Sequence, residues 1–200
     1  MLMSDSWYKV DNVAKVFLAT VSQRDPRVFR ISCTLNEEID PDTLNEALRS
    51  TAQEWPQFQV TLHRGLFWHY FESTDQLPTA QPETKAPCAP LYTPERRNKL
   101  IYRVTYFGAR INLEMFHAIT DGNGGLLYLK SIVRNYLALR HPGEMENVPS
   151  PNSASAGDMA QDSFRNFYEG TKRKKPAEKP KVYHPHGFLP YSQLQFLKDI

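Results

Sequence analysis

The chain has 200 residues, of which 40% are hydrophobic and 12% aromatic, and its formal net charge is +2. This length suits one compact domain or two small ones, and the aromatic content argues against a disordered chain. A nearly neutral charge gives no indication of binding to nucleic acid or to an anionic membrane surface. No stretch approaches about 18 consecutive apolar residues, so we expect no membrane span.

The N-terminus and the cysteines bear on location. The first residues lead into no apolar run and therefore show no signal peptide. Cys33 and Cys88 are far apart and form no CxxC pair, so neither a structural metal site nor a disulfide scaffold is expected. Together these features indicate a soluble, cytoplasmic protein.

A strand and a helix are the first elements predicted. Residues 27–34 are rich in β-branched and apolar side chains, which is typical of a strand. Asp40 can cap a helix, Pro41 suits its first position, and Pro56 ends it. The buried stripe of this helix is expected to contain Leu44, Ala47, Leu48, Thr51 and Trp55.

A first hairpin follows this helix. Residues 58–62 alternate between apolar and polar side chains, which predicts a half-buried strand. A turn at residues 64–65 leads into a returning strand over residues 66–71. The prolines of residues 78–94 then indicate a loop or an irregular edge connection.

A second hairpin and a long helix complete the first part of the chain. Residues 100–107 and 110–116 form the hairpin, and residues 123–140 follow as a helix. The buried face of that helix is expected to contain Leu126, Leu129, Val133 and Tyr136. We therefore expect one subdomain over residues 1–143, and a linker and crossover segment over residues 144–200, where the composition becomes polar and basic.

The most informative segment reads HAITDGNGG over residues 117–125. His117 follows a predicted strand, and a neutral imidazole is a competent base for an alcohol or an amine. Asp121 can fix the loop geometry without touching substrate, and the glycines allow close backbone approach at the start of a helix. The bare pattern HxxxD also fits an ordinary turn in which His117 is solvated and Asp121 caps the helix.

This segment resembles the HxxxDG motif of the chloramphenicol acetyltransferase-like superfamily, which includes condensation domains, wax ester synthases, plant acyltransferases and bacterial alcohol acetyltransferases. Residues 7–17 and 64–71 are similar to the alcohol acetyltransferase-like group. Many members carry two adjacent histidines, and Phe116 replaces the first of them, so the closest resemblance is not to a condensation domain. The resemblance implies an α+β fold with a mixed, mostly antiparallel sheet flanked by helices.

The resemblance also implies an acyltransferase mechanism. His117 would deprotonate an alcohol or amine acceptor, which attacks the thioester of an acyl group, in the first place acetyl, carried by CoA. Asp121 would give structural support, and Gly122 and Asn123 would lie at the substrate. Acyl-CoA would be a co-substrate, and neither a bound cofactor nor a metal is expected.

The resemblance covers nearly the whole chain but only about half of the usual length of the family. The second subdomain of such enzymes supplies a DFGWG-like motif, which does not occur in these 200 residues. We therefore expect a C-terminal subdomain or a partner chain to complete the active site, and activity in the full-length protein rather than in this chain alone. Two alternatives stay open: a non-catalytic interaction module or half of a split enzyme, and a condensation-like enzyme that uses a carrier protein.

Several other residues have ordinary explanations. His63 and His69 are expected to pack in or beside strands. His184 and His186 lack a third metal ligand nearby, and the basic residues 172–175 fit a solvated connection better than a site for the phosphates of CoA. The tryptophans expected in the core or at a subdomain interface are Trp7, Trp55 and Trp68.

Overall fold

The computed structural model describes residues 7–10, 12–22, 24–66, 68–93, 96 and 98–144. By internal contacts the chain divides into Met1–Phe167 and Tyr168–Ile200, and every described residue belongs to the first unit. The predictions made for the linker, the basic run and the two C-terminal histidines lie outside the described residues. None of the described helices is both long and apolar enough to cross a membrane.

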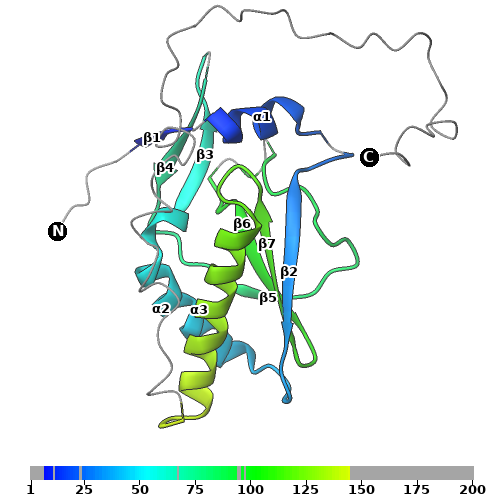
Figure 1. The fold of residues 1–200 in the computed structure, drawn as a ribbon, viewed down its shortest axis with the longest axis vertical. Helices are drawn as coiled ribbons and strands as arrows, with labels where there is room; N and C mark the ends of the chain where they lie inside the picture. Colours follow the sequence, from blue (N-terminus) through cyan, green and yellow to red (C-terminus); the bar gives the residue numbers. More distant parts are fainter. Residues whose placement is uncertain are drawn as a thin grey trace, which may run out of the picture. The chain divides into compact units, whose positions relative to one another are not determined.

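The described strands form two sheets (Figure 1). The smaller sheet has the order β1 (Trp7–Lys9), β4 (His69–Ser73), β3 (Val60–Arg64). The larger sheet has the order β2 (Val28–Thr34), β7 (Arg110–Phe116), β6 (Tyr102–Phe107), β5 (Ala80–Pro82). All strand pairs are antiparallel except β5–β6, and an isolated bridge between Thr61 and Leu100 links the two sheets. The mixed, mostly antiparallel arrangement is confirmed.

Helices α2 (Pro41–Glu54) and α3 (Gly122–Arg140) pack side by side against one face of the larger sheet (Figure 1). Strand β7 contributes Ile111, Leu113 and Met115 to the core beneath them. Because successive side chains of a strand point to opposite faces, Asn112 and Glu114 lie on the other face of the sheet. The sheet therefore has one apolar face and one face that holds polar groups.

Helix α1 (Asn12–Thr20) and strand β1 were not expected from the sequence. The helix inserts Ala14 and Leu18 into a second apolar cluster, whose other members include Val60, Leu62 and Phe116. Those partners lie at least 40 residues away along the chain, so α1 is stabilised by packing its apolar face against distant segments.

The local signals for α2 and for the second hairpin are confirmed. The carboxylate of Asp40 accepts a hydrogen bond from the backbone N–H of Thr43 at 2.7 Å, and Pro41 is the first helical residue. The predicted stripe of α2 is buried, including Trp55 directly after the helix. The hairpin turns at Gly108, whose φ of 54° lies in the left-handed region that glycine adopts easily.

The first hairpin differs from the prediction in its boundaries. Pro56–Phe58 forms a single 3₁₀ turn, so β3 begins only at Val60. Thr61 is buried rather than exposed, and its hydroxyl lies 2.8 Å from Nε2 of His63. The backbone N–H of Gly65 donates to the carbonyl of Trp68 at 2.7 Å, so the turn extends to Trp68, and the returning strand β4 begins only at His69.

The buried face of α3 and two tryptophans also differ from expectation. Leu126 is 38% exposed and Val133 only half-buried, whereas Leu129 and Tyr136 are buried as predicted. The predicted face missed the fully buried side chains Tyr128 and Ile132, which the sheet and α2 cover. Trp55 belongs to the core, but Trp7 and Trp68 are 66% and 58% exposed in the described part of the chain. Within the proline-rich stretch, Ala80–Pro82 forms the edge strand β5.

Candidate functional site

His117 lies directly after the last residue of β7, as the sequence predicted. Its backbone N–H donates to the carbonyl of Arg27 at 2.8 Å, which continues the pairing of β2 with β7 by one residue. The side chain is half-buried. The strand end therefore fixes the backbone of His117, while the direction of its ring depends on side-chain contacts.

Two phenylalanines contact the imidazole of His117. The ring of Phe17 from α1 stacks on it with 4.4 Å between centroids and 13° between planes. The ring of Phe29 from β2 approaches at 4.9 Å and 57°. Nδ1 of His117 is buried and has no hydrogen-bond partner among the described residues. The contacts that the structure shows for this ring are therefore with aromatic groups rather than with a polar group at Nδ1.

Asp121 is the N-cap of α3. Its carboxylate accepts a hydrogen bond from the backbone N–H of Gly124 at 2.8 Å, and its carbonyl accepts one from Gly125 at 3.0 Å. This is the helix-cap geometry that the sequence left open as an alternative for Asp121, while His117 is half-buried rather than fully solvated. The aspartate thus supports the turn after β7 through the helix start and not through the imidazole.

The glycines of the motif differ from one another in their surroundings. Gly122 and Asn123 are exposed, and a Cβ built on Gly122 would meet nothing within 4 Å. A Cβ built on Gly125 would lie 2.8 Å from Cε2 and 3.0 Å from Cζ of Phe29. The glycine that close packing requires is therefore Gly125, which brings the start of α3 against the ring that contacts His117.

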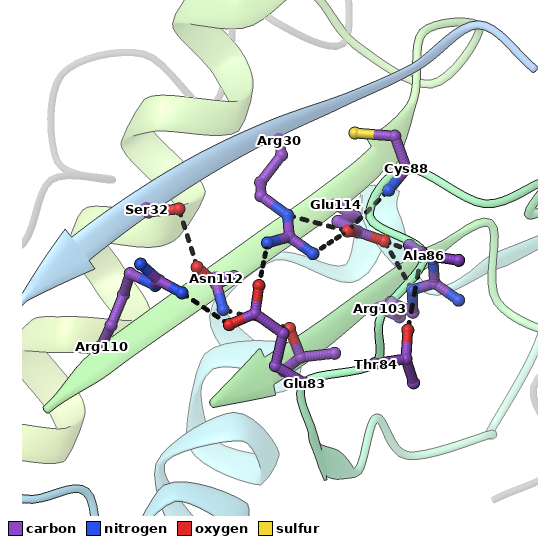
Figure 2. Close-up of polar contacts among 11 residues, drawn as sticks. Arg30, Ser32, Glu83, Thr84, Ala86, Cys88, Arg103, Arg110, Asn112 and Glu114 are labelled. Atoms are coloured by element: carbon purple, nitrogen blue, oxygen red, sulfur yellow. Dashed lines mark hydrogen bonds and ion pairs between the residues drawn. The ribbon is translucent and has the colours of Figure 1, made fainter. Parts of the chain in front are cut away.

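A cluster of charged side chains lies on the polar face of the larger sheet (Figure 2). We refer to Arg30, Glu83, Arg103, Arg110 and Glu114 as the charge cluster. Glu114 has a fully buried side chain and accepts hydrogen bonds from Nε of Arg30 at 2.8 Å and Nε of Arg103 at 2.6 Å. The backbone N–H of Cys88 donates to the same carboxylate at 2.9 Å. One carboxylate is thus shared by two guanidinium groups and a loop.

The second carboxylate of the charge cluster belongs to Glu83, just after β5. It binds Arg30 and also accepts a hydrogen bond from Nη2 of Arg110 at 2.6 Å (Figure 2). Beside it, the hydroxyl of Ser32 lies 2.8 Å from Oδ1 of Asn112 on the neighbouring strand. The sequence did not indicate this cluster, although its members on β7, Arg110 and Glu114, are four residues apart and therefore lie on the same face of the predicted strand.

Both carboxylates of the charge cluster have a lowered pKa. Burial raises the pKa of Glu114, but the hydrogen bonds from Cys88, Arg30 and Arg103 outweigh it, so the net shift is downward. Hydrogen bonds from Arg110 and Arg30 lower the pKa of Glu83. Both carboxylates are therefore ionised near neutral pH and form ion pairs with the arginine side chains of the charge cluster. These ion pairs link side chains on or beside β2, β5, β6 and β7 and thereby stabilise the sheet. Carboxylates that stay ionised in this way do not suit proton transfer.

The other described histidines on β3 and β4 pack against aromatic side chains. His63 stacks on Tyr70 at 5.4 Å, and its Nε2 lies 2.9 Å from a carboxylate oxygen of Glu72. His69 meets Tyr92 edge-on at 6.0 Å, and burial, assisted by the charge of Arg64, lowers its pKa. Within the described residues, no group of three or more His, Cys, Asp or Glu side chains could hold a metal ion.

Comparisons with known proteins give matches only at the level of structure. No family model matches the sequence, and no curated protein matches it. The starter condensation domain of rhizomide synthetase RzmA is 12% identical with a TM-score of 0.53, over 68% of this chain and 38% of that one. A mutant of that domain in complex with C8-CoA matches with the same identity and TM-score, over 67% of this chain and 36% of that one.

Two further structures show the same similarity. Polyketide synthase associated protein 5 from Mycobacterium tuberculosis is 15% identical with a TM-score of 0.52, over 74% of this chain and 37% of that one. The complex of the X-domain and OxyB from teicoplanin biosynthesis gives 13% identity and a TM-score of 0.55, over 74% of this chain and 36% of that one. The chain thus spans little more than a third of the length of these structures.

A particular closeness to alcohol acetyltransferases stays a prediction. The described residues have the α+β fold of condensation domains, the chloramphenicol acetyltransferase-like fold, over the part that these structures share.

Proposed function

We propose that this chain carries the general base of an acyltransferase, which moves an acyl group from a thioester to an alcohol or an amine. The observation that carries the proposal is His117, placed at the end of β7 with its ring in contact with two aromatic rings, in a fold shared with condensation domains. A strand end fixes the backbone of a base more firmly than a free loop does.

The chemistry is a direct transfer. Because Nδ1 is enclosed, Nε2 of His117 takes the proton of the acceptor O–H or N–H as that oxygen or nitrogen attacks the thioester carbonyl. The tetrahedral intermediate then collapses, the C–S bond breaks, and the departing thiolate recovers the proton from Nε2. No acyl-enzyme forms. Asp121 keeps α3 in place beside the base, and Gly122 and Asn123 lie on the same turn as a surface for substrate.

Acyl-CoA is the donor we favour, because a structure of the rhizomide synthetase domain contains C8-CoA. Acetyl is the first candidate for the acyl group on the resemblance of the motif. A carrier protein is the alternative donor, since the similar structures include condensation domains. A C-terminal subdomain or a partner chain supplies the rest of the site in this proposal, since this chain spans 38% of the length of the rhizomide domain.

The test measures release of free CoA by the full-length protein that contains residues 1–200. Acetyl-CoA and C8-CoA are offered with panels of alcohols and amines, for wild type and His117→Ala. Loss of a general base typically costs about 100-fold to 10,000-fold in rate, and we expect a fall in this range. An equal rate in the two proteins would remove His117 from the chemistry.

The matched control is His141→Ala. His141 follows the other end of α3, roughly 30 Å from its start at 1.5 Å per residue, and its Nε2 lies 2.9 Å from Glu37. This substitution removes an imidazole of the same fold without approaching the proposed base. We expect turnover equal to that of wild type, and a parallel fall in both variants would point to damage to the fold.

A non-catalytic interaction module is the second candidate. It is favoured by the similarity to the complex of the X-domain and OxyB, in which a domain of comparable fold occurs with a protein partner. The fold alone does not guarantee activity. Titration calorimetry with acetyl-CoA and with C8-CoA separates a CoA-dependent enzyme from a pure interaction module, because only the enzyme binds a CoA thioester. Absence of both binding and turnover in wild type would favour the module over the CoA-dependent enzyme.

A further inference from the structure

We infer that Phe17 and Phe29 form an aromatic clamp that positions the imidazole of His117, and that Gly125 is the residue that lets Phe29 reach it. The catalytic part of this inference rests on the proposed function, since positioning matters only if His117 is the base. The clamp itself is a statement about ring geometry and is open to measurement in the absence of turnover.

The first argument is the near-parallel stack of Phe17 on His117. Ring centroids 4.4 Å apart and planes 13° apart leave the imidazole little freedom to rotate out of the stack. Phe17 comes from α1, a helix anchored by Ala14 and Leu18 in the apolar cluster that also contains Phe116. The residue just before the histidine and the helix that carries its stacking partner therefore share one core.

The second argument is the lack of a polar group that orients the ring. Catalytic histidines are commonly directed by a hydrogen bond to the ring nitrogen that does not touch substrate. Here Nδ1 of His117 is buried without a hydrogen-bond partner among the described residues, and the carboxylate of Asp121 binds Gly124 instead. The contacts that the structure provides for fixing the ring are the faces and edges of Phe17 and Phe29.

The third argument is the bare Cα of Gly125. A Cβ at this position would lie 2.8 Å from Cε2 of Phe29 and 3.3 Å from Cδ1 of Ile31, closer than carbon atoms approach without displacement. Any side chain at residue 125 therefore moves the ring of Phe29. That ring touches His117, so the glycine acts on the imidazole through Phe29.

Nuclear magnetic resonance of the ring protons of His117 tests the clamp directly in the 200-residue chain. Protons above the face of a stacked phenyl ring are shifted upfield, so Phe17→Leu should abolish that shift, and Phe17→Tyr, which keeps the ring, should retain it. Gly125→Ala should move the same signals by displacing Phe29. Gly122→Ala in the same helical turn, where a Cβ meets nothing, should leave them in place.

Turnover by the full-length protein tests the positioning role. A displaced base loses rate rather than substrate affinity, and a misplacement of about 1 Å can cost about 100-fold. We expect Phe17→Leu and Gly125→Ala to lower kcat by about that factor with KM unchanged, and Phe17→Tyr to restore it. Thermal melts of each variant identify loss of fold, and Phe29→Leu serves as a second probe where one variant is unstable.

The outcomes separate the clamp from the proposed function. Unmoved His117 signals in folded Phe17→Leu and Gly125→Ala would overturn the clamp. Moved signals with an unchanged kcat, in a protein whose turnover depends on His117, would overturn the positioning role. Turnover that survives His117→Ala would contradict the proposed function, while the signals still decide whether the clamp exists.

Discussion

Arg30 and Glu114 lie directly opposite each other in the β2–β7 pair, and Arg30 binds a carboxylate that has no exposed side-chain surface. Arg103 occupies the corresponding position on the other neighbouring strand, β6, and binds the second oxygen of the same carboxylate. The buried negative charge of Glu114 is thus neutralised by one arginine from each neighbouring strand. Removing this carboxylate charge would leave two guanidinium groups, each 18% exposed, facing each other across β7.

Glu114→Gln should therefore destabilise the fold. Breaking a buried pair costs about 3 to 5 kcal/mol, and partial exposure of the two arginines places the expected loss near the lower end, about 3 kcal/mol. Urea unfolding followed by circular dichroism measures the change in the free energy of unfolding. Glu37→Gln, which affects an ion pair with Arg140 nearer the surface, is the control and should have a much smaller effect. An equal effect of the two would contradict the role of Glu114.

The same carboxylate makes stability depend on acid pH. The pKa of Glu114 in the folded chain is below its ordinary value of 4.5, so its contribution to stability is fully present above about pH 4.5. That contribution is lost as the pH falls through the lower, folded-state pKa. As the pH is lowered from about 7 to about 3, the urea concentration at the midpoint of unfolding should decrease more steeply for wild type than for Glu114→Gln. Parallel curves would show that other carboxylates account for the dependence.

Asp121 offers a test of a purely structural role. An N-cap aspartate replaced by alanine loses about 1 kcal/mol of stability, whereas asparagine caps about equally well. We expect Asp121→Ala to be less stable by this amount and Asp121→Asn to match wild type in both stability and CoA release. Denaturant titration and the turnover assay measure the two quantities. A large loss of turnover in Asp121→Asn would show that the negative charge itself is needed.

Two buried tyrosines should titrate unusually late. Burial raises the pKa of Tyr102 to about 12, although the hydroxyl of Tyr128 and the amide of Gln59 donate hydrogen bonds to it. Burial also raises the pKa of Tyr128. Both phenols therefore favour the folded state below about pH 10 and lose this contribution as the pH rises towards their folded-state pKa. Ultraviolet titration should show that Tyr102→Phe removes one late-ionising group, and an unchanged late step would contradict the assignment.

Predictions from the sequence succeeded where short-range chemistry decides the structure. Asp40 and Pro41 start α2 because a cap and a pre-set φ act within one turn, and Gly108 closes the β6–β7 hairpin for an equally local reason. They failed for β1 and α1, whose partners are β4 and the apolar cluster around Leu62. Helix α1 has Ala14, Phe17 and Leu18 at helical spacing, but the segments that bury this face lie 40 or more residues away along the chain. The three residues of β1 are too few to show a period.

The candidate site shows the same division. His117 and Asp121 are placed by a strand end and a helix start, which their own segment encodes. Phe17 lies 100 residues before His117, and nothing in the pattern of either segment links them. Gly125 was visible in the motif as one glycine among several, but only the position of Phe29 distinguishes it from Gly122.

The two edge strands of the larger sheet differ in how readily they can pair with an additional strand. At one edge, the short strand β5 ends in Pro82, which has no N–H to donate to a further strand. At the other, β2 runs for seven residues without a proline and pairs with a single described strand. Proline and brevity are common protections against edge-to-edge association, and β2 has neither. Within the described part of the chain, β5 is therefore the edge of the larger sheet that is better protected against pairing with a further strand or a second molecule. Strand β2 is the edge at which such pairing is more readily possible.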